Sequence, residues 1–336
     1  MIPEYSRARG PASTGGKAHR GGTATVWENV GVTPAGPRTQ QPVDLTRFAW
    51  LSIVAAVITI VLKTVAWRIT GSVGLLSDAA ESVVNLVAAI VALVALRVSI
   101  KPPDKNHHFG HSKAEYFSAA IEGIMIFVAA GVIIVTASER FLHPRPIENV
   151  GVGLGVSTVA SLVNGGVSFV LLRAAKKYRS MTLEADGKHL LTDVWTSVGV
   201  VVGVLLVAVT GWTRLDALVA FAVGVNILVT GWSLIAKSTA GLMDVSLPKE
   251  DNQAIRDVLD SYTSPALQFH ALRTRESGNR RFMMCHMLVP GVMTVQRSHD
   301  IIEEITAELL ALFPDLTVTI HTEPIEDPLS YEDEDL

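Results

Sequence analysis

Two stretches of the chain carry polar side chains at the same helical spacing within apolar sequence. In "SDAAESVVNL" these residues are Glu81 and Asn85, and in "EADGKHLLTDVW" they are His189 and Asp193. Residues four positions apart are neighbours on one face of a helix, so each stretch can offer two ligands to one ion. If the two helices pack together, two carboxylates, an amide oxygen and an imidazole form a tetrahedral site for a divalent cation.

An acidic residue precedes each pair by about one turn, Asp78 in the first stretch and Asp186 in the second. These two side chains either cap their helices or line the entrance to the cation site. For the four candidate ligands the competing interpretation is hydrogen bonding between helices, the usual task of a lone His or Asn in a membrane helix. Because an ionisable side chain at the centre of a bilayer costs about 2.5–3.5 kcal/mol, the duplicated pattern favours a metal site.

A second candidate site lies in the polar segment "PPDKNHHFGHSKAE". Asp104, His107, His108 and His111 fall close together there, at a spacing that could hold a small divalent ion. Short His-rich loops also bind metal adventitiously, so the segment by itself leaves both interpretations open.

A third candidate site comprises residues near the C-terminus. His270, His286, His299 and His321 lie in this region, and Glu323 follows His321 by two positions. Residues two apart on a strand share a face, so His321 and Glu323 could reach the same cation. A lone strand histidine is usually a half-buried surface residue, but the clustering predicts a regulatory metal site.

The composition indicates the elements that hold these residues. Of the 336 residues 49% are hydrophobic and only 18% are charged, which is typical of a protein that crosses a membrane several times. Six stretches are long enough, at about 1.5 Å per residue, to cross a hydrocarbon core of roughly 30 Å. They lie near residues 48–66, 73–96, 117–138, 150–173, 190–211 and 214–235.

Six crossings place both termini on one side of the membrane. The loops on that side are richer in Lys and Arg than the opposite loops, so we expect both termini in the cytoplasm. The single cysteine, Cys285, fits a reducing compartment and excludes an internal disulfide. No targeting segment is evident, which favours a bacterial inner membrane. No basic patch with interleaved aromatic residues indicates a nucleic-acid partner.

After about residue 247 the sequence changes to a pattern typical of a soluble domain. "PKEDNQAIRDVLDSY" predicts an amphipathic helix, and two strand-like runs around "SGNR" predict a hairpin. A second helix, "QRSHDIIEEITAELLALF", and an alternating strand, "LTVTIHTE", follow. The order αββαβ predicts a small two-layer α/β domain with its helices on one face of a sheet. Cys285 should point to the face opposite its neighbour His286 and pack in the core.

We therefore expect four parts. Residues 1–45 are rich in Gly, Pro, Ser, Thr and Arg and predict a disordered N-terminal tail; 46–240 form the six-span transmembrane domain; 245–324 form the α/β domain; and 325–336 form an acidic tail.

The motifs, taken in order, resemble those of the cation diffusion facilitator family. They are "SVGLLSDAAESVVN", "DKNHHFGHSKAE", "EADGKHLLTDVWTS" and the run from "LRTRESGNRRF" through "VTIHTEP", and the resemblance covers roughly residues 47 to 323. It implies an all-α bundle of six transmembrane helices with a ferredoxin-like, metallochaperone-like cytoplasmic domain. It also implies a homodimer in the lipid bilayer that exports divalent metal in exchange for protons and has no enzymatic activity or prosthetic group.

The resemblance also implies roles for individual residues. The family's four transport ligands, here called the quartet, match Glu81, Asn85, His189 and Asp193, and its loop site matches Asp104, His107 and His111. Its cytoplasmic site matches His270, His286, His321 and Glu323, with His299 as a further ligand. A charge pair near the membrane surface, which helps to lock the dimer in relatives, matches Lys113 and Asp244.

The quartet departs from the family pattern in its first helix. Relatives commonly have His or Asp at the position of Glu81 and Asp at the position of Asn85. Because Asn is neutral, the site carries about two negative charges rather than three. The imidazole of His189 still favours a borderline transition metal over Mg²⁺ or Ca²⁺, so we expect Zn²⁺ first, then Fe²⁺, Co²⁺, Cd²⁺ and Mn²⁺.

The expected mechanism is alternating access around the quartet, with protons competing for the ligands and driving antiport. The metal is then the transported substrate and, at the cytoplasmic site, a regulatory ligand. A membrane-anchored metal sensor or scaffold without transport is the alternative. An intramembrane metallohydrolase is a weaker one, since no HExxH pattern occurs.

Overall fold

The structure is a computed structural model that describes residues 43–70, 73–143, 150–212 and 214–332. Most of the predicted N-terminal tail and the last four residues of the acidic tail lie outside these ranges. Within the helices, the side chains of Asp78 and Glu81 also lie outside the described part, although the backbone at both positions is helical.

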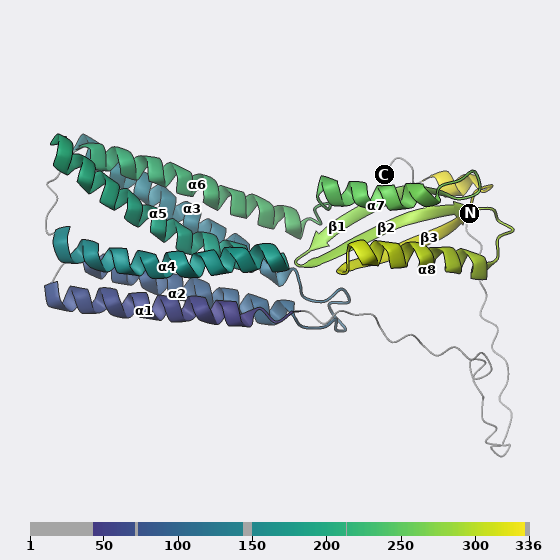
Figure 1. The fold of residues 1–336 in the computed structure, drawn as a ribbon, viewed down its shortest axis with the longest axis horizontal. Coiled ribbons are helices and arrows are strands. Elements are labelled where there is room, and N and C mark those ends of the chain that lie inside the picture. Colours follow the sequence, from purple (N-terminus) through teal and green to yellow (C-terminus); the bar gives the residue numbers. More distant parts are fainter. Residues whose placement is uncertain (1–42, 71–72, 144–149, 213, 333–336) are drawn as a thin grey trace, which may run out of the picture. The chain divides into compact units, whose positions relative to one another are not determined.

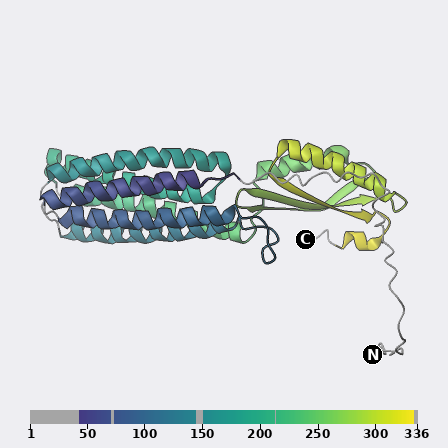
Figure 2. The same ribbon diagram turned by 90° about the horizontal axis from the view of Figure 1, so that it is seen from below.

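Six long helices form a bundle, and their neighbours lie side by side in Figures 1 and 2. All six are long and apolar enough to cross a membrane. Their presence confirms the predicted six-helix part of the fold. The helices are α1 (Thr46–Thr70), α2 (Val73–Ser99), α3 (Ala114–Leu142), α4 (Val150–Tyr178), α5 (Met181–Thr210) and α6 (Arg214–Leu242).

Helix α5 begins nine residues earlier than the apolar stretch predicted. Its N-cap is Ser180, whose side-chain oxygen accepts a hydrogen bond from the N–H of Leu183. The carboxylate of Glu115, on α3, accepts from the Ser180 hydroxyl and lies 3.4 Å from the N–H of Thr182. A negative charge at a helix N-terminus is stabilising, so these polar residues fix where α5 starts. A hydropathy pattern misses such a turn because its residues are polar.

Helices α3 and α6 make the closest contact in the bundle. A Cβ atom at Gly231 would lie 2.8 Å from the backbone nitrogen of Phe127, so only glycine permits this approach. Ile126, Ile227 and Leu234 are almost fully buried along the same contact. Close backbone packing through small residues is the common way in which membrane helices associate.

The chain after residue 248 forms a two-layer α/β region, which we call the C-terminal region (residues 249–332). Its elements follow the predicted order αββαβ, which confirms this part of the fold. They are α7 (Lys249–Tyr262), β1 (Gln268–Ser277), β2 (Arg280–Val289), α8 (Val295–Leu312) and β3 (Leu316–Pro324). The sheet order is β1-β2-β3, with β1 antiparallel and β3 parallel to β2.

Both helices of the C-terminal region cover the same face of the sheet. Alternate residues of β2, Met283, Cys285 and Met287, are buried there against Ile255 of α7 and Ile305 of α8. Burying one such side chain is worth about 1.5–3 kcal/mol. The opposite face carries the short 3-10 helix η2 (Pro328–Tyr331), within the predicted acidic tail, as Figure 2 shows. The alternation therefore leaves the residues between these core positions free to build a site on that opposite face.

Candidate metal sites

Three of the four predicted ligands in the bundle meet where α2 faces α5. Asn85 donates through Nδ2 to Oδ2 of Asp193 at 2.5 Å, and His189 Nε2 lies 2.9 Å from Asn85 Oδ1. Asn85 and His189 are only 6% and 8% exposed. An amide Oδ1 can only accept, so His189 Nε2 carries the proton in this arrangement. We call Asn85, His189 and Asp193 the bundle trio; Glu81, the fourth predicted ligand, has its side chain outside the described residues.

Asn85 bonds to both other members of the bundle trio. A cation that binds His189 Nε2 must displace the proton from that nitrogen and break its hydrogen bond to Asn85 Oδ1. A carboxylate, an amide oxygen and an imidazole are nevertheless donors that a borderline transition metal accepts. In this arrangement His189 Nε2 bonds to Asn85, so this nitrogen must exchange that partner before it binds an ion.

Asn164 of α4 belongs to the same group, and sequence reasoning missed it. Its Nδ2 donates to Oδ2 of Asp193 at 3.0 Å, and the residue is 5% exposed. Its own Oδ1 has no hydrogen-bond partner among the described residues. The available signal was a single amide in the apolar span "SLVNGGVSF". Asp193 thus receives hydrogen bonds from two helices, α2 and α4.

Two further carboxyl groups lie inside the bundle. Asp186, one turn before His189 on α5, is 2% exposed. It does not cap α5, because Ser180 occupies that position. Glu122 of α3 is fully buried, with one oxygen 3.3 Å from the hydroxyl of Ser118, and sequence reasoning did not single it out. A charged residue in the middle of "SAAIEGIMIF" was the signal.

The loop between α2 and α3 brings together Asp104, His107 and His111, three of the four residues that the sequence singled out there. His107 Nδ1 lies 3.2 Å from Asp104 Oδ1, and His111 Nε2 lies 3.3 Å from Asp104 Oδ2. One donor atom from each residue lies within 4.8 Å of the others, a spacing suited to one metal ion. The backbone N–H groups of Asn106 and His107 both donate to Asp104 and lower the pKa of its carboxyl. His108 is not part of this group.

A third group lies on the open face of the sheet. His270 of β1 and His286 of β2 are register neighbours, and Glu323 comes from β3. Glu323 Oε2 lies 3.1 Å from His270 Nε2 and 3.2 Å from His286 Nδ1. These three donor atoms also lie within 4.8 Å of one another. We call His270, His286 and Glu323 the sheet cluster.

The other predicted ligands of this region differ in placement. His321 Nε2 lies 3.6 Å from Glu323 Oε1, at the exposed edge of the sheet cluster. His299 is exposed on α8, which covers the opposite face of the sheet, so it lies apart from the cluster and its part as a further ligand stays a prediction. Tyr331 of η2 stacks on the His270 ring at a centroid distance of 6.4 Å, a contact that the sequence did not reveal.

Lys113 and Asp244, the predicted charge pair, do meet. Lys113 Nζ lies 3.0 Å from Asp244 Oδ1, and Arg275 of β1 contacts the same oxygen at 2.9 Å. Partial burial raises the pKa of the Asp244 carboxyl, but hydrogen bonds and ion pairs with these two cations outweigh it and lower the pKa overall. The guanidinium of Arg275 also lies over the Phe282 ring, 4.3 Å from its centroid. The pair therefore connects the start of α3 to strand β1.

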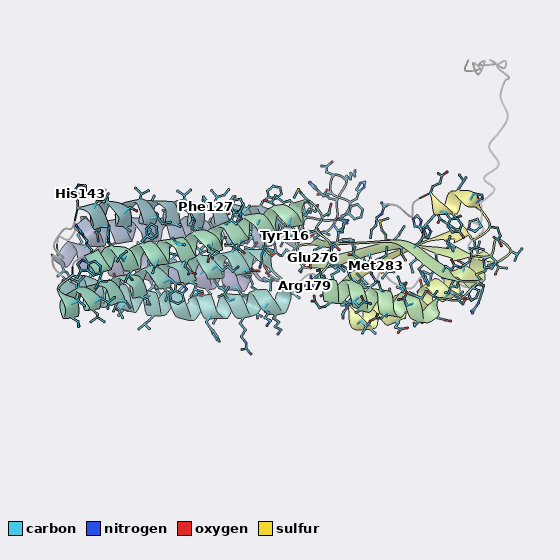
Figure 3. The ribbon with its side chains drawn as sticks, turned by 90° about the horizontal axis from the view of Figure 1, so that it is seen from above. Tyr116, Phe127, His143, Arg179, Glu276 and Met283 are labelled. Atoms are coloured by element: carbon cyan, nitrogen blue, oxygen red, sulfur yellow. The ribbon has the colours of Figure 1, made fainter. Side chains whose placement is uncertain are left out.

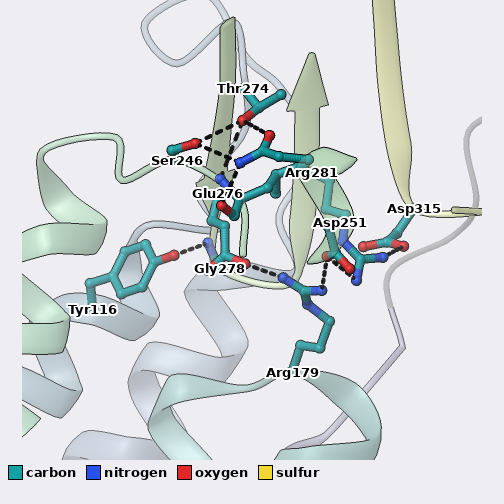
Figure 4. Close-up of polar contacts among 11 residues, drawn as sticks. Tyr116, Arg179, Ser246, Asp251, Thr274, Glu276, Gly278, Arg281 and Asp315 are labelled. Atoms are coloured by element: carbon teal, nitrogen blue, oxygen red, sulfur yellow. Dashed lines mark hydrogen bonds and ion pairs between the residues drawn. The ribbon is translucent and has the colours of Figure 1, made fainter. Parts of the chain in front are cut away.

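The hairpin between β1 and β2 makes a second connection to the bundle. Figure 3 shows Tyr116, Arg179 and Glu276 close together there, and Figure 4 shows their contacts. The N–H of Gly278 donates to the Tyr116 hydroxyl at 3.0 Å. Arg179, in the turn before α5, donates to Glu276 and forms an ion pair with Asp251 at 3.5 Å. Because Arg179 directly precedes the N-cap of α5, the hairpin contacts the helix that carries His189 and Asp193.

The fold and the buried polar group together define a multi-pass membrane protein with candidate cation ligands inside its bundle. Comparison with known proteins supports this class. Residues 49–243 match the model of the cation efflux transmembrane domain, and residues 247–325 match that of the cation efflux protein cytoplasmic domain.

Known proteins are similar to the chain over most of its length. The chain is 50% identical to the uncharacterized transporter sll1263 of Synechocystis sp. over 288 residues, which are 86% of this chain and 93% of the relative. It is 33% identical to the cation-efflux pump FieF of Serratia proteamaculans over 270 residues, 80% of this chain and 89% of the relative. The solved structure "Mode of Action of a Putative Zinc Transporter CzrB" shares 38% identity over 23% of this chain and 96% of its own, with a TM-score of 0.22.

The chain belongs to the cation diffusion facilitator family of cation efflux transporters. This confirms the family that the motifs indicated, and it is a family of transporters rather than of enzymes.

Proposed function

We propose that the protein exports a divalent transition-metal cation, Zn²⁺ first, in exchange for protons. The observation that carries the proposal is the bundle trio: a carboxylate, an amide and an imidazole that contact one another between two membrane helices, with the amide and the imidazole buried. Packing alone has no need of a carboxylate and an imidazole at this depth, where each is costly. The imidazole favours Zn²⁺ over Mg²⁺ or Ca²⁺, with Fe²⁺, Co²⁺, Cd²⁺ and Mn²⁺ as further substrates.

Protons compete with the metal at this site. His189 binds metal only through a nitrogen that carries no proton, and Asp193 binds it as the carboxylate. Because a proton and a metal ion compete for the same nitrogen of His189, we expect this residue to exchange one for the other. Proton uptake from the far side then releases the metal, and alternating access of the bundle couples the two fluxes.

The same proposal places the protein in its membrane. Residues 46–240 form the transmembrane domain of a homodimer and residues 245–324 its cytoplasmic domain, with both termini in the cytoplasm. The description of the second family model as a cytoplasmic domain supports this orientation. The bacterial FieF relatives support a bacterial inner membrane. Metal at the sheet cluster acts as a regulatory ligand, and the Lys113–Asp244 pair braces the dimer near the membrane surface.

Proteoliposomes loaded with a zinc-sensitive dye test the transport site. His189→Ala and Asp193→Asn should lower Zn²⁺ flux by more than about a hundredfold, since loss of even an outer-shell partner costs 10–100-fold. The matched control, His270→Ala with His286→Ala, removes two histidines from the sheet cluster and should keep most of the flux. Unchanged flux in folded His189→Ala and Asp193→Asn protein would refute the site. A lumenal pH that stays constant during Zn²⁺ flux would refute proton exchange.

A metal sensor without transport is the second candidate, because two of the three groups lie outside the bundle. A sensor needs no metal ligands inside the bundle, so one measurement of Zn²⁺ flux distinguishes the two functions. If the protein is a sensor, flux through the wild-type chain equals that of empty liposomes, while metal still binds the sheet cluster.

A further inference from the structure

A cavity of about 540 Å³ lies where the bundle adjoins the C-terminal region. The end of α4, the start of α5, the end of α6 and the β1–β2 hairpin line it. Its walls are largely apolar, with Leu172, Ala175, Met181, Ala240 and Val245 among the lining residues. A volume of this order accommodates part of a lipid or another small amphiphile.

The cavity also carries an excess of positive charge. Four cationic side chains and two carboxylates line it, which gives a net charge of +2; they are Lys176, Arg179, Lys188 and Lys237 against Glu184 and Glu276. The carboxylates do not neutralise the cations evenly. Lys188 and Lys237 share one oxygen of Glu184, at 2.7 and 2.8 Å. Lys176 makes no ion pair within the part of the chain that the structure describes.

The remaining cation of the cavity is already engaged. Arg179 bonds to Glu276 and Asp251, as Figure 4 shows. The excess positive charge of the cavity therefore comes from the lysines of α4, α5 and α6, the three helices that end or begin at the cavity.

We propose that this cavity binds the headgroup of an anionic phospholipid from the adjacent leaflet. The phosphate is held by Lys176, Lys188 and Lys237, and the first acyl carbons lie against the apolar wall that includes Leu172. Lysines at the ends of membrane helices reach phosphates through flexible apolar stems. The excess positive charge disfavours a divalent cation, and a soluble anion gains nothing from the apolar wall. The proposal requires only that the bundle crosses a membrane, so it does not depend on metal transport.

Binding of phosphatidylglycerol to the full-length chain in detergent, measured by native mass spectrometry, tests the site. Phosphatidylcholine with the same acyl chains is the reference lipid, and we expect the wild-type chain to prefer phosphatidylglycerol. Lys176→Gln with Lys237→Gln should raise the Kd for phosphatidylglycerol by about tenfold, because each interfacial lysine contributes to anionic-lipid binding. Lys176→Gln alone should raise it by a smaller factor.

The matched control is Arg173→Gln with Lys177→Gln. Both residues are exposed on the same helix as Lys176 and do not line the cavity, so this control also removes two positive charges. Its Kd should stay within about twofold of wild type. Equal weakening by the control, equal binding of both lipids, or displacement of phosphatidylglycerol by millimolar inorganic phosphate would each overturn the proposal. An unchanged thermal midpoint without added lipid shows that each variant is folded.

Discussion

The bundle trio and the sheet cluster are built from similar side chains, yet they are arranged in opposite ways. In the sheet cluster Glu323 sits at the centre and two imidazoles point to the same carboxylate oxygen, at 3.1 and 3.2 Å. In the bundle trio a neutral amide, Asn85, lies between the imidazole and the carboxylate and bonds to both. Both groups contain internal hydrogen bonds, but in the sheet cluster two imidazoles surround one carboxylate oxygen, whereas in the bundle trio Asn85 separates the imidazole from the carboxylate.

The surroundings account for this difference. The side chains of the sheet cluster are 10–18% exposed and lie on an open face, where water competes for each contact. Asn85 and His189 of the bundle trio are 6% and 8% exposed between apolar helices, where an unpaired polar group costs about 1–3 kcal/mol. Under the proposed function the bundle trio is emptied in every transport cycle, and its internal hydrogen bonds then satisfy the polar atoms of Asn85 and His189 Nε2. The regulatory role proposed for the sheet cluster requires no such cycle.

Substitution of Glu323 gives the largest expected effect on metal binding. Glu323→Gln removes the only carboxylate of the sheet cluster, so the affinity of that site for Zn²⁺ should fall by about a hundredfold. Equilibrium dialysis with metal analysis measures the loss of one bound ion per chain. Transport should stay within about threefold of wild type, and Glu303→Gln, an exposed carboxylate on α8, is the control. If transport falls as steeply as binding, the two sites are not independent and the comparison fails.

Substitution of Asn85 tests the same comparison at the bundle trio. Asn85→Asp places a second carboxylate next to Asp193, so like charges repel in the absence of metal and a cation relieves the repulsion. We expect the affinity of the transport site for Zn²⁺ to rise by about tenfold, the equivalent of roughly 1.4 kcal/mol. The measurement is dye competition in a Glu323→Gln background.

Asn85→Leu is the matched variant for that experiment. It removes the amide without adding charge and should weaken Zn²⁺ binding at the transport site. If Asn85→Asp and Asn85→Leu have the same effect, Asn85 only fills space, and its position between His189 and Asp193 has no bearing on the metal.

Asn164 tests whether Asp193 needs partners from two helices. Asn164→Leu removes the donor on α4 but leaves the one on α2, so Zn²⁺ flux should fall by a factor of about five, the equivalent of roughly 1 kcal/mol for one hydrogen bond. Asn226→Leu, an exposed amide on α6, is the control and should transport normally. Equal flux in the two variants would remove Asn164 from the group around Asp193.

Much of this arrangement was predictable from the sequence. Helical spacing singled out Asn85, His189 and Asp193, which meet in the structure, because residues four apart must share a face. The place of Glu81 and the role of all four residues as ligands stay predictions. Strand alternation placed His321 and Glu323 together and Cys285 on the other face from His286. In both cases a local repeat, fixed by backbone geometry alone, determined which side chains could meet.

The parts that sequence reasoning missed depend on contacts between distant segments. Asn164 is a single residue in its span and shows no repeat, so only the packing of α4 on α5 reveals its bond to Asp193. Glu115 supports the start of α5 from another helix. The stacking of Tyr331 on His270 likewise depends on how the chain folds back after β3. None of these contacts has a local pattern, since no periodicity relates the residues involved.

Cys285 tests whether the two faces of the sheet are separate. It is 1% exposed, and burial raises the pKa of its thiol to about 12. Because the folded pKa lies above the unfolded value of roughly 8.5, this thiol contributes no pH dependence to stability below that value and destabilises the fold as the pH rises above it. At pH 8 the folded chain should therefore react with iodoacetamide at least about a hundredfold more slowly than a free thiol, because the thiolate is the reactive form.

The control for Cys285 is a cysteine on the open face. Met284 is 50% exposed and points away from the helices, so Met284→Cys in a Cys285→Ala background should react at nearly the rate of a free thiol. Intact-mass measurement over time follows both reactions. Bound Zn²⁺ should leave the reactivity of Cys285 unchanged, because its sulfur lies on the opposite face from the sheet cluster. A rapid reaction of Cys285 in folded protein, or protection of Cys285 by Zn²⁺, would mean that the metal and the core share one face of the sheet. The sheet cluster would then not be the open, preassembled site that the comparison requires.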